Sequence, residues 1–182
     1  LISFAGLMND FSSARLGFDS VSGATPLAMM RSGETVDLGL LVLGRIPGTI
    51  GEVSVVALLI GAVYMLVKKV ISPRIPLIYI GTVAVFLFLF GGFDPYYVLC
   101  EVCSGGLVFG AFFMATDYVT SPITPKGQVV YGVVLGLLTG IFRLWGASPE
   151  GVSYAIILSN LLVPMIERVT LPKAFGREGK KA

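Results

Sequence analysis

Long apolar stretches dominate the chain after residue 50, and short segments rich in Pro, Gly and charge separate them. A helix needs about 20 mainly apolar residues to cross a bilayer core of about 30 Å. Because the connectors are short, neighbouring helices are expected to run antiparallel. The pattern predicts an all-α integral membrane protein with five transmembrane helices, approximately Val53–Val70, Ile75–Phe93, Tyr96–Thr116, Gly127–Trp145 and Val152–Val169.

A sixth apolar run, Leu38–Gly44, is too short to cross the membrane and precedes a Pro47-Gly48 turn. One interpretation is a re-entrant half-helix, because irregular backbone is tolerated at membrane depth where protein or a watery cavity surrounds it. The other is a surface loop packed on the helix bundle. The sequence leaves both interpretations open.

The chain divides by composition into three parts. Residues 1–37 mix polar and apolar side chains and are predicted to form an extramembrane loop, 38–171 the helical membrane domain, and 172–182 a basic tail. The sequence begins at Leu1 and has no signal-peptide pattern, which is consistent with a fragment of a longer protein.

Charge and composition exclude several classes of function. Hydrophobic residues make up 55% of the chain and charged residues 13%, far from the average of soluble domains. A net charge of +2 does not indicate a nucleic-acid partner. The absence of histidine excludes His-dependent triads, His-ligated metal sites and imidazole proton relays within this chain.

The distribution of Lys and Arg predicts the orientation, because cytoplasmic loops carry the excess of positive charge. The connectors Gly91–Pro95 and Ala147–Gly151 contain acidic but no basic residues and are predicted outside, together with residue 50 and what precedes it. Arg143 is expected to snorkel at a helix end. The basic residues that fall on the predicted cytoplasmic side are Lys68, Lys69, Arg74, Lys126, Arg168, Lys173, Arg177, Lys180 and Lys181.

The segment from Asp19 to Leu27 holds the strongest candidate for chemistry. Thr25 is a good helix N-cap and Pro26 suits the first helical position, so a short helix is expected after Thr25. A phosphate on Thr25 would gain about 0.3–1 kcal/mol from the helix end, while Gly23 and Ala24 leave the hydroxyl accessible. Taken alone, the segment also fits an ordinary capped turn.

The same segment resembles the motif at which FMN is joined through its phosphate to a threonine in respiratory sodium pumps. Three further segments resemble the same family in the same order. The chain is similar over nearly its whole length to the family that contains the D subunit of the Rnf complex and the B subunit of sodium-translocating NADH:quinone reductase. The segments that carry the resemblance are Asp19-x-x-Ser22-Gly23-Ala24-Thr25, Gly44–Glu52, Phe113–Asp117 and Pro149–Ala155 with Ser159-Asn160.

The resemblance implies a subunit of an ion-translocating oxidoreductase that has no catalytic residues of its own. It implies electron transfer between ferredoxin and NAD coupled to Na⁺ or H⁺ export across the prokaryotic inner membrane. It further implies covalent FMN on Thr25 on the outer side, within a motif formed by Asp19, Ser22, Gly23 and Ala24, and allows a second, non-covalent riboflavin. The implied partners are other Rnf subunits, the bilayer and a flavin transferase. Family members carry further membrane helices before this part.

Several ionisable and polar residues lie in or near the predicted helices. Glu52 and Asp117 are candidates for an ion or flavin pocket, although interfacial anchoring or structural pairing is favoured for them, for Glu101 and for Arg143. Asn160 is a candidate for the same pocket or for a hydrogen bond between helices, and helix packing is favoured.

Cys100 and Cys103 share a helix face, but a tetrahedral metal site needs about four ligands. Packing of small residues is therefore favoured over metal binding, and no metal site is predicted. Two alternatives to a flavoprotein stay open: a small-solute channel or transporter with a half-helix, and a structural membrane scaffold.

Overall fold

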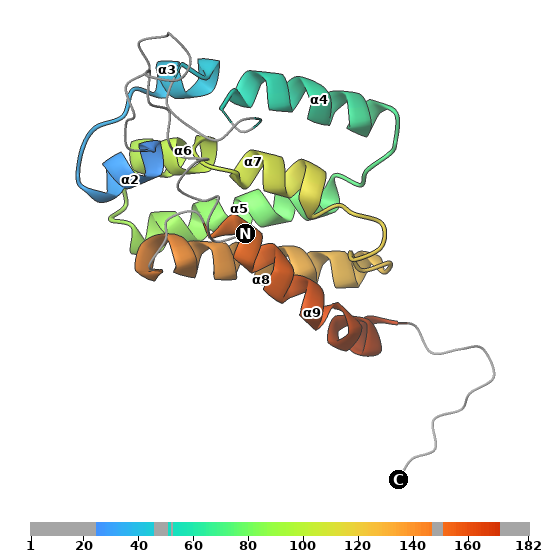
Figure 1. Cartoon of the computed structure of the whole chain (residues 1–182). Helices are drawn as coiled ribbons and strands as arrows, with labels where there is room; N and C mark the ends of the chain where they lie inside the picture. The colour runs from blue at the N-terminus through green and yellow to red at the C-terminus, as the bar shows by residue number, and fades with distance from the viewer. Residues whose placement is uncertain (1–24, 46–50, 52, 147–150, 172–182) are drawn as a thin grey trace, which may run out of the picture.

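The computed structural model describes residues 25–45, 51, 53–146 and 151–171. Within these ranges every regular element is a helix and none is a strand, as the hydrophobic pattern predicts. Figure 1 shows the longer helices side by side, with two short helices at one end. The elements are α2 (Pro26–Arg31), α3 (Leu38–Leu43), α4 (Val55–Val67), α5 (Arg74–Phe90), α6 (Pro95–Cys103), α7 (Leu107–Phe109), the π-helix η3 (Gly110–Met114), α8 (Pro125–Trp145) and α9 (Val152–Thr170).

Several helices begin where a polar side chain satisfies a free backbone amide. Ser54 accepts a hydrogen bond from Ala57 N, Asp94 from Tyr96 N, and Thr124 from Gly127 N. Proline follows directly after both Asp94 and Thr124, where its missing N–H costs no helical hydrogen bond. These starts follow from local sequence alone.

Two helices are long and apolar enough to cross a membrane by themselves, α8 with 21 residues and α9 with 19. The α4 and α5 helices have 13 and 17 residues, and at 1.5 Å per residue α4 is about 20 Å long. The structure thus supports an integral membrane protein with two to three candidate spans. The five-span count stays a prediction.

The expectation of one continuous helix over Tyr96–Thr116 is wrong. Helix α6 ends at Cys103, and the segment Leu107–Met114 continues at an angle of 66° to it. Gly105 lies between them with φ of +61°, a left-handed conformation that glycine adopts without steric cost. The Ser104-Gly105-Gly106 sequence therefore forms a break in an apolar stretch that is otherwise long enough to span.

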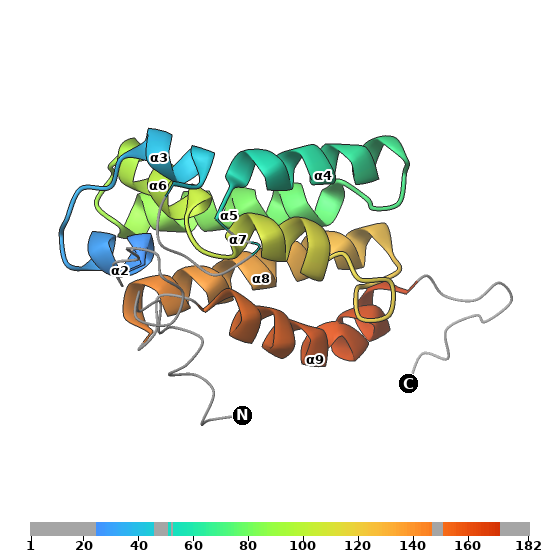
Figure 2. The ribbon, with the colours of Figure 1, turned by 45° about the horizontal axis from the view of Figure 1, so that its top comes forward.

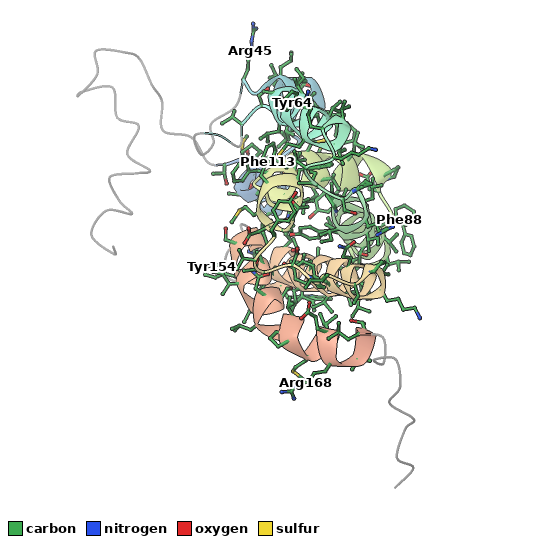
Figure 3. The ribbon with its side chains drawn as sticks, turned by 90° about the vertical axis from the view of Figure 1, so that its right-hand side faces the viewer. Arg45, Tyr64, Phe88, Phe113, Tyr154 and Arg168 are labelled. Carbon is green, nitrogen blue, oxygen red and sulfur yellow. The ribbon has the colours of Figure 1, made fainter. Side chains whose placement is uncertain are left out.

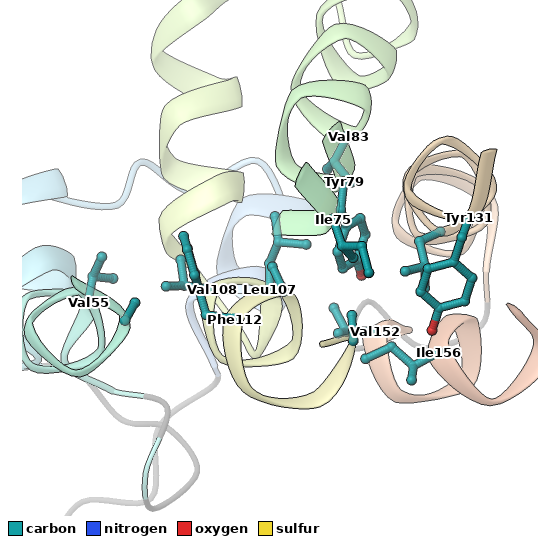
Figure 4. Close-up of a cluster of buried hydrophobic side chains, with 14 of the residues drawn as sticks. Val55, Ile75, Tyr79, Val83, Leu107, Val108, Phe112, Tyr131, Val152 and Ile156 are labelled. Carbon is teal, nitrogen blue, oxygen red and sulfur yellow. The ribbon is translucent and has the colours of Figure 1, made fainter. Parts of the chain in front are cut away.

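Helices α5 and α8 form the most extensive interface of the bundle. Gly132, Gly136 and Gly140 repeat every four residues along α8, and their missing side chains leave room for Ile78, Thr82 and Phe86 of α5. Small residues at this spacing let two helices approach closely. Figure 4 shows buried side chains of α4, α5, α7, η3, α8 and α9 meeting in one core, among them Tyr79, Leu107 and Ile156.

The outside of the bundle is strongly apolar. Tyr64, Phe88 and Tyr154 point away from the helices in Figure 3, and 64%, 40% and 62% of their surfaces are exposed. Such a surface fits contact with lipid or with another membrane protein better than contact with water.

The basic residues of the described connectors gather at one end of the bundle, the right-hand end in Figure 2. There Tyr118 donates a hydrogen bond to Val70 O, and Thr124 bonds Thr170 at 2.8 Å, so three chain segments meet. Helices α2 and α3 lie at the opposite end, where Arg31 and Arg45 are the exposed cations. The cations at the first end are Lys68, Lys69, Arg74, Lys126 and Arg168.

The run Leu38–Gly44 contains a helix of six residues, α3. Asp37 caps its first turn by accepting a hydrogen bond from Gly39 N, and Gly44 ends it with φ of +82°. It packs beside α4 and α6. A short capped helix is common to the re-entrant and the surface interpretation, so both stay open.

Candidate functional site

Thr25 is the N-cap of α2, as the sequence predicts. Its backbone is extended, Pro26 takes the first helical position, and Met29 N donates to Thr25 O at 3.0 Å. The Thr25 side chain is half-buried and makes no capping hydrogen bond. The hydroxyl is therefore not needed to hold α2 together. The neighbouring motif residues Asp19, Ser22, Gly23 and Ala24 lie outside the described residues.

Two contacts fix α2 against the membrane domain. Leu27 is only 2% exposed and lies over Gly105, where an added Cβ would come within 2.5 Å of Leu27 Cδ1. At the other end of the helix, Arg31 Nη2 donates a hydrogen bond of 2.7 Å to Gly146 O. Thr25 is thus attached to a helix that rests on both the α6–α7 break and the end of α8.

A buried ion pair lies at this break. Arg143 Nη1 of α8 is 3.0 Å from Glu101 Oε2 of α6, and each residue is 4% exposed. The other carboxylate oxygen of Glu101 accepts a hydrogen bond of 3.0 Å from the Tyr97 hydroxyl. Both charges are therefore partnered, as burial in an apolar bundle requires.

Arg143 also satisfies backbone carbonyls that the break leaves free. Nη1 donates to Glu101 O, and Nη2 donates to Ser104 O at 3.0 Å. The last carbonyls of a helix have no intrahelical donor, and a guanidinium is well suited to several of them at once. The guanidinium thus replaces the hydrogen bonds that a continuous helix would have made.

The prediction that Arg143 snorkels to the interface is wrong. Its guanidinium turns inward because Glu101 and the free carbonyls of α6 offer better partners than the apolar surroundings of an exposed position. Structural pairing, the interpretation favoured for Glu101, is confirmed by the ion pair.

A cavity of about 210 Å³ lies between the end of α2 and the start of α6. Met30, Tyr96, Tyr97 and Cys100 contribute to its wall. Both tyrosine hydroxyls are engaged, since Tyr96 donates to Val36 O at 2.9 Å and Tyr97 donates to Glu101. The cavity is smaller than the roughly 300–1,000 Å³ of typical ligand pockets, so it does not fit a whole flavin.

The three candidate pocket residues are not brought into one described site. Asp117 is exposed and accepts a hydrogen bond of 3.2 Å from Thr120 Oγ1. Asn160 is half-buried on α9 and accepts a hydrogen bond of 2.5 Å from the Tyr131 hydroxyl of α8. This bond between helices confirms the favoured role of Asn160. Glu52 lies outside the described residues.

Cys100 is buried and Cys103 half-buried, and both are free thiols. Among the residues the structure describes, no three His, Cys, Asp or Glu side chains are grouped as metal ligands would be. Cys100 Sγ points toward Val36 O at 4.0 Å, beside the chain that connects α2 to α3.

Replacing Cys100 and Cys103 together with Ala is expected to preserve the flavin and iron content of the assembled complex. The cost in unfolding free energy should be about 1 kcal/mol, because the main loss is the buried Cys100 sulfur. Metal analysis and thermal unfolding of the purified variant check this. Loss of a stoichiometric metal would overturn the packing role.

Comparison with known proteins assigns the family. Residues 1–176 match the model of the NQR2, RnfD, RnfE family. The chain belongs to this family. The match includes the Thr25 segment and all described helices, in agreement with the resemblance seen in the sequence.

Curated relatives carry names of one kind. The chain is 47% identical over 163 residues to the D subunit of the Na(+)-translocating ferredoxin:NAD(+) oxidoreductase complex of Acetobacterium woodii, covering 87% of this chain and 50% of that protein. It is 40% identical over 177 residues to the D subunit of the proton-translocating ferredoxin:NAD(+) oxidoreductase complex of Clostridium ljungdahlii, covering 88% and 53%. It is 36% identical over 190 residues to the D subunit of the ion-translocating oxidoreductase complex of Stutzerimonas stutzeri, covering 96% and 53%.

The chain thus spans about half the length of these curated relatives. Sequence reasoning about this family member found Thr25 and its helix but missed two features of the site. The opposite charges of Glu101 and Arg143 within apolar stretches were a usable signal for their pairing. Nothing in the sequence points to the contact between Arg31 and Gly146, which are 115 residues apart.

Proposed function

We propose that this chain is part of a membrane subunit of an Rnf-type complex that couples electron transfer between ferredoxin and NAD to Na⁺ or H⁺ translocation. Membership in the NQR2, RnfD, RnfE family and the names of the relatives support this proposal. The apolar helices support a site in the cytoplasmic membrane, alongside the other subunits of the complex. The subunit acts within that assembly and not as an enzyme alone.

The subunit carries FMN on Thr25 through a phosphoester. The observation that carries this assignment is a threonine hydroxyl that its own helix does not use, at the start of a helix anchored to the membrane domain. FMN, when bound, accepts and donates electrons one or two at a time. The protein's task is to supply the hydroxyl, hold the attachment point and exclude other reactions around it.

Ester formation requires a flavin transferase as a maturation partner. The Thr25 hydroxyl loses its proton to a base, and its oxygen forms the bond to phosphorus while a leaving group departs from an activated flavin phosphate. The segment Asp19–Ala24 is what such an enzyme would recognise in sequence. Non-covalent riboflavin, which the resemblance allows, has no residues assigned to it here.

Mass spectrometry of the Thr25 peptide tests the covalent flavin. The peptide from cells that express the whole complex and a competent flavin transferase is expected to carry the mass of FMN less water. An unmodified peptide from these cells would refute the assignment.

The Thr25 loop is proposed to lie outside and the C-terminal tail in the cytoplasm. The gathering of five cations at one end of the bundle supports this orientation. In a background without Cys100 and Cys103, Ser20→Cys should react with an impermeant thiol reagent added to intact cells, whereas Lys180→Cys should react only after lysis. The reverse pattern would refute the topology.

A small-solute channel or transporter is the second candidate, because the broken α6–α7 span is of the kind found in transporters. Arg143, however, already occupies the break with its guanidinium. Solute flux into liposomes that contain this chain alone, with no flavin on Thr25, would favour the channel over the flavoprotein.

A further inference from the structure

We propose that Arg143 is a positioning residue that holds the break between α6 and α7 in one geometry and thereby fixes α2, with Thr25, on the membrane domain. The functional importance of that position rests on the proposed flavin attachment. The positioning itself is a property of the described residues and is tested without flavin.

The first step is the convergence of acceptors on one guanidinium. Glu101 contributes a carboxylate oxygen and its backbone carbonyl, and Ser104 contributes a second carbonyl. These groups belong to the last turn of α6 and the residue that follows it. Their arrangement exists only while the chain turns away at this point, so the guanidinium and the bent geometry stabilise each other.

The second step is that the forked shape of arginine matters. Nη1 and Nη2 reach different carbonyls, 101 and 104, from one rigid planar group. A lysine ammonium at this position keeps the charge but presents a single point of donation. We therefore expect Arg143→Lys to keep the ion pair and to lose part of the constraint on the break.

The third step connects the break to α2. Gly105, the left-handed residue of the break, lies against Leu27 Cδ1, and its Cβ position is 3.5 Å from Arg143 Nη2. Arg31 at the far end of α2 bonds Gly146, three residues after Arg143 on the chain. Both anchors of α2 are thus next to Arg143, and a shift of the break displaces the helix that begins at Thr25.

A buried pair of this kind is better explained by geometry than by stability. Removing two charges from water is costly, and a well-packed apolar pair is often equally stable or more so. What the apolar pair cannot do is cap the two carbonyls of the break. This difference is the reason to assign Arg143 a positioning role.

The test measures the position of α2 directly. Spin labels are placed at Ser32→Cys, at the exposed end of α2, and at Val169→Cys, which is 87% exposed near the far end of α9. The full chain, lacking Cys100 and Cys103, is reconstituted in lipid nanodiscs, and the distance distribution is measured by double electron–electron resonance. The parent is expected to give a single narrow distribution.

Arg143→Ala should give a clearly broader distribution, and guanidinium chloride at a concentration far below denaturing should narrow it again, whereas the same concentration of sodium chloride should not. Gly105→Ala leaves the ion pair in place but puts a methyl against Leu27, and should displace the distribution by itself. Gly81→Ala is the matched control, because nothing lies within 4 Å of its added Cβ.

Distributions in both Arg143→Ala and Gly105→Ala that match the parent would overturn the proposal. If Arg143→Ala does not fold, the comparison of Gly105→Ala and Arg143→Lys with the parent decides in the same way. In the assembled complex, the Thr25 peptide of Gly105→Ala should still carry FMN, while reduction of that flavin slows by about tenfold or more, the scale on which a misplacement of about 1 Å slows geometry-dependent reactions. Loss of FMN from the parent complex would instead refute the proposed function and leave the positioning result intact.

Discussion

Thr25→Val is expected to abolish the ultraviolet-excited fluorescence of the denatured polypeptide completely. Valine keeps the shape of threonine but has no hydroxyl to form the phosphoester. The fold of α2 should survive, because the Thr25 carbonyl, and not its side chain, bonds Met29 N. In-gel fluorescence, followed by immunodetection of the membrane-inserted protein, measures both outcomes.

Thr25→Ser is the matched control, since it retains the nucleophilic hydroxyl. It should keep part of the label. Electron transfer from ferredoxin to NAD by the assembled complex should be lost in Thr25→Val and partly retained in Thr25→Ser. A fluorescent band in Thr25→Val would show that the flavin is attached elsewhere.

Gly136→Leu is expected to destabilise the bundle by about 3 kcal/mol or more, at the upper end of the costs of overpacking. The Cβ of a residue at 136 would come within 2.7 Å of Thr82 Cγ2 and 3.1 Å of the Tyr79 carbonyl oxygen. The obstacle includes backbone, so α5 and α8 must separate along their largest shared surface. Thermal unfolding of the full chain in one detergent measures the loss.

Gly81→Leu is the corresponding control on α5. Gly81 is exposed, and nothing lies within 4 Å of an added Cβ, so this change should leave the unfolding temperature close to that of the parent. Equal unfolding temperatures for Gly136→Leu and Gly81→Leu would contradict the close α5–α8 interface.

The starts of several helices could be read from the sequence, since each depends on residues a few positions apart. Thr25 with Pro26 is the clearest case, and the resulting helix begins where the sequence predicts. The end of α6 was missed, although the Ser104-Gly105-Gly106 signal is local. In a long apolar stretch, small residues are equally suited to close helix packing and to a break, and only the partner helix decides between them.

Asn160 illustrates the same limit for side chains. Its place in an apolar helix indicated a polar partner, and helix packing was the favoured role. That the partner is the Tyr131 hydroxyl depends on how α8 and α9 pack, because the two residues are 29 positions apart.

The sequence by itself determined the helical membrane class, the family, the candidate Thr25 and the clustering of cations at one end. These follow from apolar length, local capping and the antiparallel order of helices, all of which act over short stretches of chain. Only the tertiary structure decided that Arg143 turns inward to Glu101 and that α2 rests on the α6–α7 break. These contacts join residues 42 and 115 positions apart, such as Arg143 with Glu101 and Arg31 with Gly146. Their partners are chosen by how helices pack and by the need of buried charges and free carbonyls for hydrogen bonds, which no local pattern encodes.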